Sequence, residues 1–144
     1  MAEPEATPPI LLDTMVLTYL TDPRNPRPEW DPLVQGRTPV LSFVTVGEIL
    51  HATRTSGWGK AQIAAVEARL QTYTVIPGTI GVARKYAELR SRFWKQVGEN
   101  DLWVAACVLS QPTPLSLATE DGDFDKISEV FPLDLVRPPT AASV

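Results

Sequence analysis

The sequence contains very few of the side chains that form disulfides or bind structural zinc. Among its 144 residues there is one cysteine, Cys107, and one histidine, His51. A single cysteine excludes an intramolecular disulfide, and these two residues together cannot supply the ligands of a structural zinc site. The fold must therefore be held together by its apolar core.

Long apolar segments and a basic leader are also missing. The longest uninterrupted apolar run covers residues 102–109, far short of the roughly 20 residues that a membrane-spanning helix needs. The stretch 1–9 is acidic, whereas a signal peptide begins with basic residues. We therefore expect a cytoplasmic protein that does not contact membranes.

Positive charge is in short supply as well. There are 13 Lys and Arg residues against 17 Asp and Glu residues, which gives a net charge of −4. This negative net charge argues against a protein that binds nucleic acid through its overall charge, although local basic patches remain compatible with it. The hydrophobic fraction of 44% is ordinary for a compact fold. We expect one domain over residues 10–137, with a flexible N-terminus over 1–9 and a flexible tail over 138–144.

Short apolar runs that alternate with amphipathic stretches predict the fold class. Strands are expected at residues 10–12, 40–41, 75–76, 115–118 and 133–136. Apolar residues recur between them with helical spacing, including a long stripe over 82–97 that Gly98 should end and a following helix that Asn100 should cap. Prolines in residues 22–32 predict a stiff loop. This alternation is typical of an α/β fold with a central, mainly parallel β-sheet flanked by helices.

Acidic residues stand at and beside the carboxyl ends of the predicted strands, where ligands usually bind in such a sheet. Asp13 follows the first strand, Glu48 lies on the helix after the second, and Asp101 begins a later helix. Asp121 and Asp123 follow the next-to-last strand. Each has an ordinary explanation, as a helix cap, a solvated helix face or a turn residue. A doubly wound sheet would nevertheless bring them together.

A cluster of carboxylates repels itself unless cations occupy it. Oxygen ligands without histidine or cysteine suit Mg²⁺ or Mn²⁺. Two such ions about 3.5–4 Å apart generate hydroxide and stabilise both the attacking and the leaving oxygen of a phosphodiester displacement. The pattern therefore indicates nuclease chemistry, and it leaves open whether one ion or two are bound.

Four motifs, in this order, resemble the signature of PIN-domain ribonucleases, and most closely that of VapC-type toxins of type II toxin–antitoxin systems. The motifs cover residues 10–14, 42–48, 100–106 and 118–124, and the resemblance extends over about 10–136. It implies a three-layer fold around a parallel sheet, Mg²⁺-dependent RNA cleavage and a homodimer. It also implies a small cognate antitoxin that neutralises the protein by inserting a segment into the active-site groove.

The resemblance further implies roles for the acidic residues. Asp13 and Asp101 would be the principal metal ligands, and Glu48 would be the third acid, directly or through a bound water. Asp123 takes the place of the acid in the family's last motif, yet Asp121 also fits a ligand position. All five are therefore candidate catalytic residues, and the choice of the fourth ligand stays open.

Two threonines next to these acids are candidates for orienting them. Thr14 and Thr119 each carry a hydroxyl that can hydrogen-bond a ligating carboxylate. The proline-rich stretch 22–32 departs from the helical segment usual at this place in the family. Because of this departure, the resemblance does not predict the local shape of the active-site groove.

Other interpretations compete with the nuclease. A catalytically silent PIN-like module that binds RNA or protein would carry the same motifs, because a fold alone does not establish turnover. Receiver and haloacid-dehalogenase domains also place an Asp after the first strand. They require a paired acid or Asp-x-Asp there, however, and Asp13 is followed by Thr14 and Met15. The sequence therefore disfavours both.

Three further features have a structural and a functional interpretation. His51 lies three residues after Glu48 and is a candidate general base, but two-metal hydrolysis needs none. A basic stripe suits either RNA phosphates or a solvated helix face, and we favour the latter. The stripe consists of Arg84, Arg92 and Lys95, with Lys85 and Arg90 nearby. Trp103 could stack on an unpaired base or pack within the protein, and we expect packing.

Overall fold

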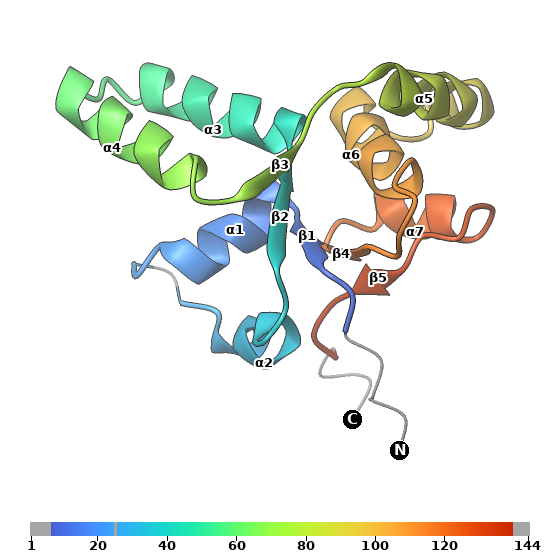
Figure 1. Ribbon diagram of the computed structural model, residues 1–144, viewed down its shortest axis with the longest axis horizontal. Coiled ribbons are helices and arrows are strands. Elements are labelled where there is room, and N and C mark those ends of the chain that lie inside the picture. Colours follow the sequence, from blue (N-terminus) through green and yellow to red (C-terminus); the bar gives the residue numbers. More distant parts are fainter. Residues whose placement is uncertain (1–6, 25, 140–144) are drawn as a thin grey trace.

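The computed structural model describes residues 7–24 and 26–139 and contains a five-stranded sheet in the order β3-β2-β1-β4-β5 (Figure 1). Its strands are β1 (Ile10–Leu12), β2 (Pro39–Ser42), β3 (Thr74–Ile76), β4 (Ser116–Ala118) and β5 (Leu135–Val136). Every neighbouring pair is parallel. The predicted α/β class and parallel sheet are confirmed. Strand β1 has the predicted bounds, and each other strand differs from prediction by one or two residues at an end.

The helices cover both faces of this sheet, so the predicted three layers are present (Figure 1). They are α1 (Thr14–Thr21), the 3-10 turn η1 (Pro28–Trp30), α2 (Asp31–Val34), α3 (Phe43–Thr55), α4 (Lys60–Leu70), α5 (Ile80–Phe93), α6 (Glu99–Leu109) and α7 (Asp123–Ser128). On one face, α1, η1 and α2 pack with the inner sides of α3 and α4. The other face carries α5, α6 and α7.

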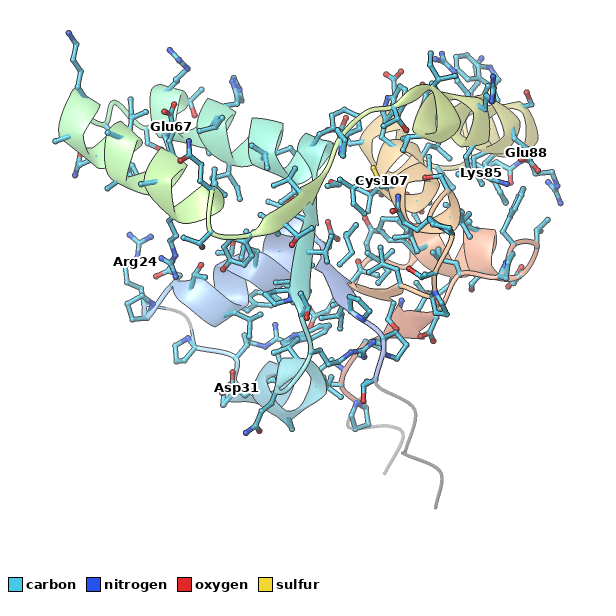
Figure 2. All side chains as sticks on the ribbon, in the orientation of Figure 1. Arg24, Asp31, Glu67, Lys85, Glu88 and Cys107 are labelled. Atoms are coloured by element: carbon cyan, nitrogen blue, oxygen red, sulfur yellow. The ribbon has the colours of Figure 1, made fainter. Side chains whose placement is uncertain are left out.

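The alternation of side chains along β1 explains the two apolar clusters. Ile10 and Leu12 point to the face that carries α1, while Leu11 points to the face that carries α6. All three are almost fully buried. Cys107 on α6 is also buried in the second of these clusters (Figure 2). A strand covered on both faces needs a continuous apolar run, and the sequence of β1 provides one.

The predicted loop over 22–32 is wrong in its second half. Residues from Pro28 onward form η1 and α2, and Trp30 has no exposed surface. Pro28 is the first residue of η1 and Pro32 the second residue of α2, positions where a helix does not use the proline nitrogen as a donor. Proline is therefore a helix-starting residue here.

The junction between α5 and α6 also differs from prediction. Helix α5 ends at Phe93, and Lys95 adopts a left-handed backbone conformation with φ 64°. Val97 lies outside the helix, although it is buried like the residues of the apolar stripe. Gly98, predicted to end the earlier helix, is the N-cap of α6, so Asn100 lies inside α6 and does not cap it. The turn after α5 buries Val97 four residues beyond Phe93, which is the spacing of apolar residues on one face of a helix. The sequence pattern therefore could not distinguish this turn from a longer helix.

The flexible ends expected at 1–9 and 138–144 lie largely outside the described residues, and the domain limits stay a prediction. Within the described ranges, no helix combines the length and the apolarity needed to cross a bilayer.

Candidate metal centre

The acidic residues gather at the carboxyl ends of β1, the central strand, and of its neighbour β4. The chain leaves β1 toward β2 on one side, while β4 lies on the other, so this edge is the switch point of the sheet. The backbone N–H of Asp13 donates to the carbonyl oxygen of Ala118 at 3.0 Å, which holds the two strand ends together. Helix α6 brings Asp101 to the same edge in its first turn.

Three carboxylates form the centre of the site. Asp101, Asp121 and Asp123 each offer one oxygen atom, and these atoms all lie within 4.8 Å of one another. Burial raises the pKa of Asp101 to about 7, with further contributions from a hydrogen bond to Asp121 and from the negative charges of Asp121, Asp13 and Asp123. Burial and the neighbouring carboxylates thus both disfavour the charged form of Asp101.

Asp13 caps α1 and faces this group of three. Its Oδ1 accepts a hydrogen bond from the Thr14 backbone N–H at 2.8 Å, and its Oδ2 accepts one from the Thr119 hydroxyl at 2.8 Å. Burial raises the pKa of Asp13, the two hydrogen bonds oppose this shift, and the charge of Asp121 adds to it. Asp13 therefore caps α1 and also lies close enough to Asp121 for the two charges to interact.

Glu48 reaches the site from α3 through Thr14. The Thr14 hydroxyl lies 3.2 Å from Glu48 Oε1 and 3.2 Å from Thr45 Oγ1. Burial raises the pKa of Glu48, and the charge of Asp13 raises it further, whereas the hydrogen bond to Thr14 lowers it. The pKa of Glu48 is thus affected by the charge of Asp13. Glu48 is nevertheless not one of the three carboxylates that converge within 4.8 Å.

Sequence reasoning missed the part played by Thr45. This residue is fully buried, and its backbone N–H donates to the N-cap Ser42 at 3.1 Å. Its hydroxyl lies 3.3 Å from the Ser42 hydroxyl and joins it to Thr14. A polar residue three positions after a helix cap was the signal that could have found it.

Asp121 and Asp123 both belong to the cluster, but their surroundings differ. The Asp121 carboxylate accepts a hydrogen bond from the Asp123 backbone N–H at 2.9 Å, and the Asp121 N–H donates to Thr119 Oγ1 at 3.0 Å. Asp123 forms an ion pair of 3.1 Å with Lys126, one turn along α7. Asp123 therefore has a counter-charge within the protein, and Asp121 is fixed by the loop itself.

Glu120, between two residues of the site, turns away from it. Its carboxylate forms an ion pair with Arg27 and accepts hydrogen bonds from the Tyr19 hydroxyl at 3.2 Å and from the Trp30 indole N–H at 3.3 Å. Sequence reasoning also missed this contact. It joins the proline-rich stretch to the loop after β4, across 93 residues of sequence, and no local pattern signals it.

Two other candidates lie apart from the acidic group. His51 is exposed on α3 and is not one of the converging ligands. Trp103 packs as expected, stacked on Tyr86 with ring centroids 3.6 Å apart. The donors at the centre are all carboxylate oxygens, and this set fits a hard divalent cation such as Mg²⁺ or Mn²⁺.

Comparisons with known proteins relate most of the chain to one family. The family model for the PIN domain matches residues 10–130. VapBC-5 from Mycobacterium tuberculosis, a member of the VapBC family of toxin–antitoxin systems, is 26% identical with a TM-score of 0.65, over 90% of this chain and 99% of that chain. VapBC-1 from nontypeable Haemophilus influenzae is 24% identical with a TM-score of 0.69, over 88% and 96%.

FitAcB from Neisseria gonorrhoeae is a third structure with the same fold. It is 22% identical with a TM-score of 0.68, over 90% of this chain and 97% of that chain. No curated protein sequence matches the chain.

Proposed function

Because the chain belongs to the PIN domain family, we propose that it is a ribonuclease that hydrolyses RNA phosphodiester bonds with Mg²⁺, or with Mn²⁺ in its place. The convergence of Asp101, Asp121 and Asp123 within 4.8 Å carries this proposal. The raised pKa of Asp101 supports it, because a site of this charge favours a divalent cation over an empty state.

Each acidic residue has a role in this proposal. Asp13 and Asp101 are the principal ligands, Asp121 and Asp123 complete the set, and Glu48 contributes through a water molecule. A bound Mg²⁺ would supply a hydroxide nucleophile and stabilise charge on the phosphate oxygens. Metal binding requires deprotonated carboxylates, so Asp101 must release its proton first.

The threonines hold these ligands in place. Thr119 fixes one oxygen of Asp13 and so restrains the orientation of that carboxylate. Thr14 restrains Glu48 in the same way from the first turn of α1. Both therefore act by orienting ligands, and neither needs to touch RNA.

We also propose that the chain is the toxin of a toxin–antitoxin pair that acts in the cytoplasm as a homodimer. The support is the fold shared with VapBC-5 and VapBC-1 over almost their whole length. The partner would be a small cognate antitoxin that brings Arg or Lys to the acidic centre, because such a side chain replaces the charge of a metal ion there.

Cleavage of a labelled single-stranded RNA in Mg²⁺, with and without EDTA, tests the ribonuclease proposal. The Asp101→Asn variant should lose activity by orders of magnitude while keeping its circular dichroism spectrum, and His51→Ala should retain wild-type activity. Full activity in folded Asp101→Asn overturns the role of this residue. A wild-type protein that binds RNA without cleaving it supports the silent-module alternative.

The toxin proposal is tested in growing bacteria. Expression of the wild-type chain should stop growth, whereas Asp101→Asn should not. Co-expression of the small protein encoded next to this chain should restore growth and yield a stable complex. A harmless wild-type chain that copurifies with no such partner contradicts the toxin proposal and leaves the nuclease proposal standing.

A further inference from the structure

Positive charge is concentrated on one element of this acidic protein. The segment 80–97 contains five of the 13 Lys and Arg residues and a single acidic residue, Glu88, although the chain as a whole has a net charge of −4. Part of this charge is neutralised locally, because Lys85 pairs with Glu88 at 2.9 Å (Figure 2) and Arg90 pairs with Glu99 at 3.3 Å. Even so, α5 and the turn after it carry more positive than negative charge, which suits a polyanion.

An exposed tryptophan stands at the end of this basic helix. Trp94 follows the last residue of α5 and is 54% exposed. The guanidinium carbon of Arg90 lies 4.3 Å from the centroid of the Trp94 ring. The two side chains line a shallow hollow together with Tyr86, Ala87 and Ser91. A planar cation and an indole ring therefore share one open surface.

Two contacts join α5 and the turn after it to the helices that carry Asp101 and Asp123. Arg90 Nη1 lies 3.3 Å from Glu99 Oε1, and Glu99 begins the helix whose third residue is Asp101. Lys126 donates to the Gln96 carbonyl oxygen at 3.0 Å and pairs with Asp123. The hollow therefore lies beside the N-terminal end of α6, the helix end that also carries Asp101, and α5 lies alongside α6 (Figure 1).

We propose that Trp94 and Arg90 form a subsite for one unpaired base and its phosphate in the RNA strand that reaches the metal centre. This inference rests on the proposed ribonuclease function. An aromatic ring stacks on a base that is not in a duplex, and a neighbouring guanidinium binds the adjacent phosphate. The local excess of positive charge suits a polyanion, and the exposed Trp94 ring favours RNA over an acidic protein surface as the occupant, because only RNA offers a base to stack on it.

Fluorescence anisotropy with a labelled single-stranded RNA oligonucleotide, in EDTA and low salt, measures this binding without cleavage. Trp94→Ala should weaken the affinity by at least about five-fold, which is the lower limit for loss of one base–aromatic stack. Trp94→Phe should keep most of the affinity, because a phenyl ring still stacks. Arg90→Gln should reduce the dependence of the affinity on salt concentration.

Trp58→Ala is the matched control. Trp58 is 44% exposed, and it lies in the turn between α3 and α4, at the opposite end of the molecule from α5 (Figure 1). This variant should bind the oligonucleotide as the wild type does. Light scattering on all variants reports whether a substitution changes the association of the chain with itself.

Three results would overturn the subsite: unchanged affinity in Trp94→Ala, an equal loss in Trp58→Ala, or no binding of single-stranded RNA by the wild type. A change of molar mass in Trp94→Ala without loss of RNA affinity would assign the surface to a protein contact. Cleavage by the wild type with an unchanged KM in Trp94→Ala would refute the subsite alone. Failure of the wild type to cleave any RNA would refute the proposed function and would leave the binding measurement interpretable.

Discussion

Thr119 joins Asp13 to the loop after β4 through a single hydroxyl group. This hydroxyl donates to Asp13 Oδ2 at 2.8 Å and accepts from the Asp121 backbone N–H at 3.0 Å. Thr119 is fully buried. One side chain therefore sets the distance between the residues that follow two neighbouring strands, and the acidic centre depends on that distance.

We expect Thr119→Val to lower the free energy of unfolding by about 1–3 kcal/mol, because two polar partners lose their hydrogen bonds in a buried setting. The pKa of Asp13 should rise further, since the hydrogen bond from Thr119 lowers it. Urea denaturation measures the first effect. Thr119→Ser, which keeps the hydroxyl, is the control, and equal stability of the Val and Ser variants would contradict the argument.

Lys126 competes with a metal ion for Asp123, which it contacts at 3.1 Å. Lys126→Met should therefore tighten the binding of Mg²⁺ or Mn²⁺, by up to about 30-fold, because a unit charge about 4 Å from a divalent ion costs about 2 kcal/mol in a water-like dielectric. Isothermal titration calorimetry measures the affinity. Lys60→Met, at the start of α4, removes the same charge away from the site. A similar change in both variants would show only a general charge effect.

The sequence could predict the acidic site because its members follow local rules. Asp13 comes directly after an uninterrupted apolar strand, and Asp101 lies in the first turn of a helix. Parallel strands place such residues at one edge of the sheet whatever the details of the loops. Only the relation between Asp121 and Asp123 needed coordinates, since both occupy one short turn and both reach the cluster.

The contacts around the site could not be predicted, because they join residues that are distant in sequence. Arg27 meets Glu120 only after the proline-rich stretch folds as η1 and α2 around the buried Trp30. Proline usually ends a helix, but it is favoured in the first turn of one. Which of the two applies depends on where the helix begins, and the local sequence does not show this. Gly98 shows the same ambiguity, since glycine suits both a helix end and an N-cap.

The contact between Glu120 and Arg27 gives a third prediction. Glu120→Gln keeps an oxygen acceptor for Trp30 but removes the charge that pairs with Arg27, so we expect a loss of about 1 kcal/mol in unfolding free energy. The control is Arg24→Gln, whose ion pair with Asp22 is formed by a side chain that is 85% exposed, and the loss there should be close to zero. Equal losses in urea denaturation would show that the Glu120 contact does not anchor η1.

Asp101 makes the stability of the metal-free protein depend on pH. Folding raises its pKa from an ordinary value of 3.8 to about 7. Between these values the folded protein holds a proton that the unfolded chain has lost. By linkage, the free energy of unfolding then falls as pH rises through this window, and the contribution is fully present only below the lower value. Asp13 and Glu48, whose pKa values are also raised, act in the same direction.

In EDTA, the wild type should therefore lose thermal stability between about pH 4 and pH 7 more steeply than Asp101→Asn, which has no proton to release at this position. Above pH 7 the variant should melt at the higher temperature, because it lacks the repelling charge. Millimolar Mg²⁺ should raise the melting temperature of the wild type by mass action and that of the variant much less. Glu88→Gln, which removes one exposed charge on α5, is the control and should behave like the wild type. Parallel melting curves and equal Mg²⁺ shifts in the wild type and Asp101→Asn would remove Asp101 from the metal centre.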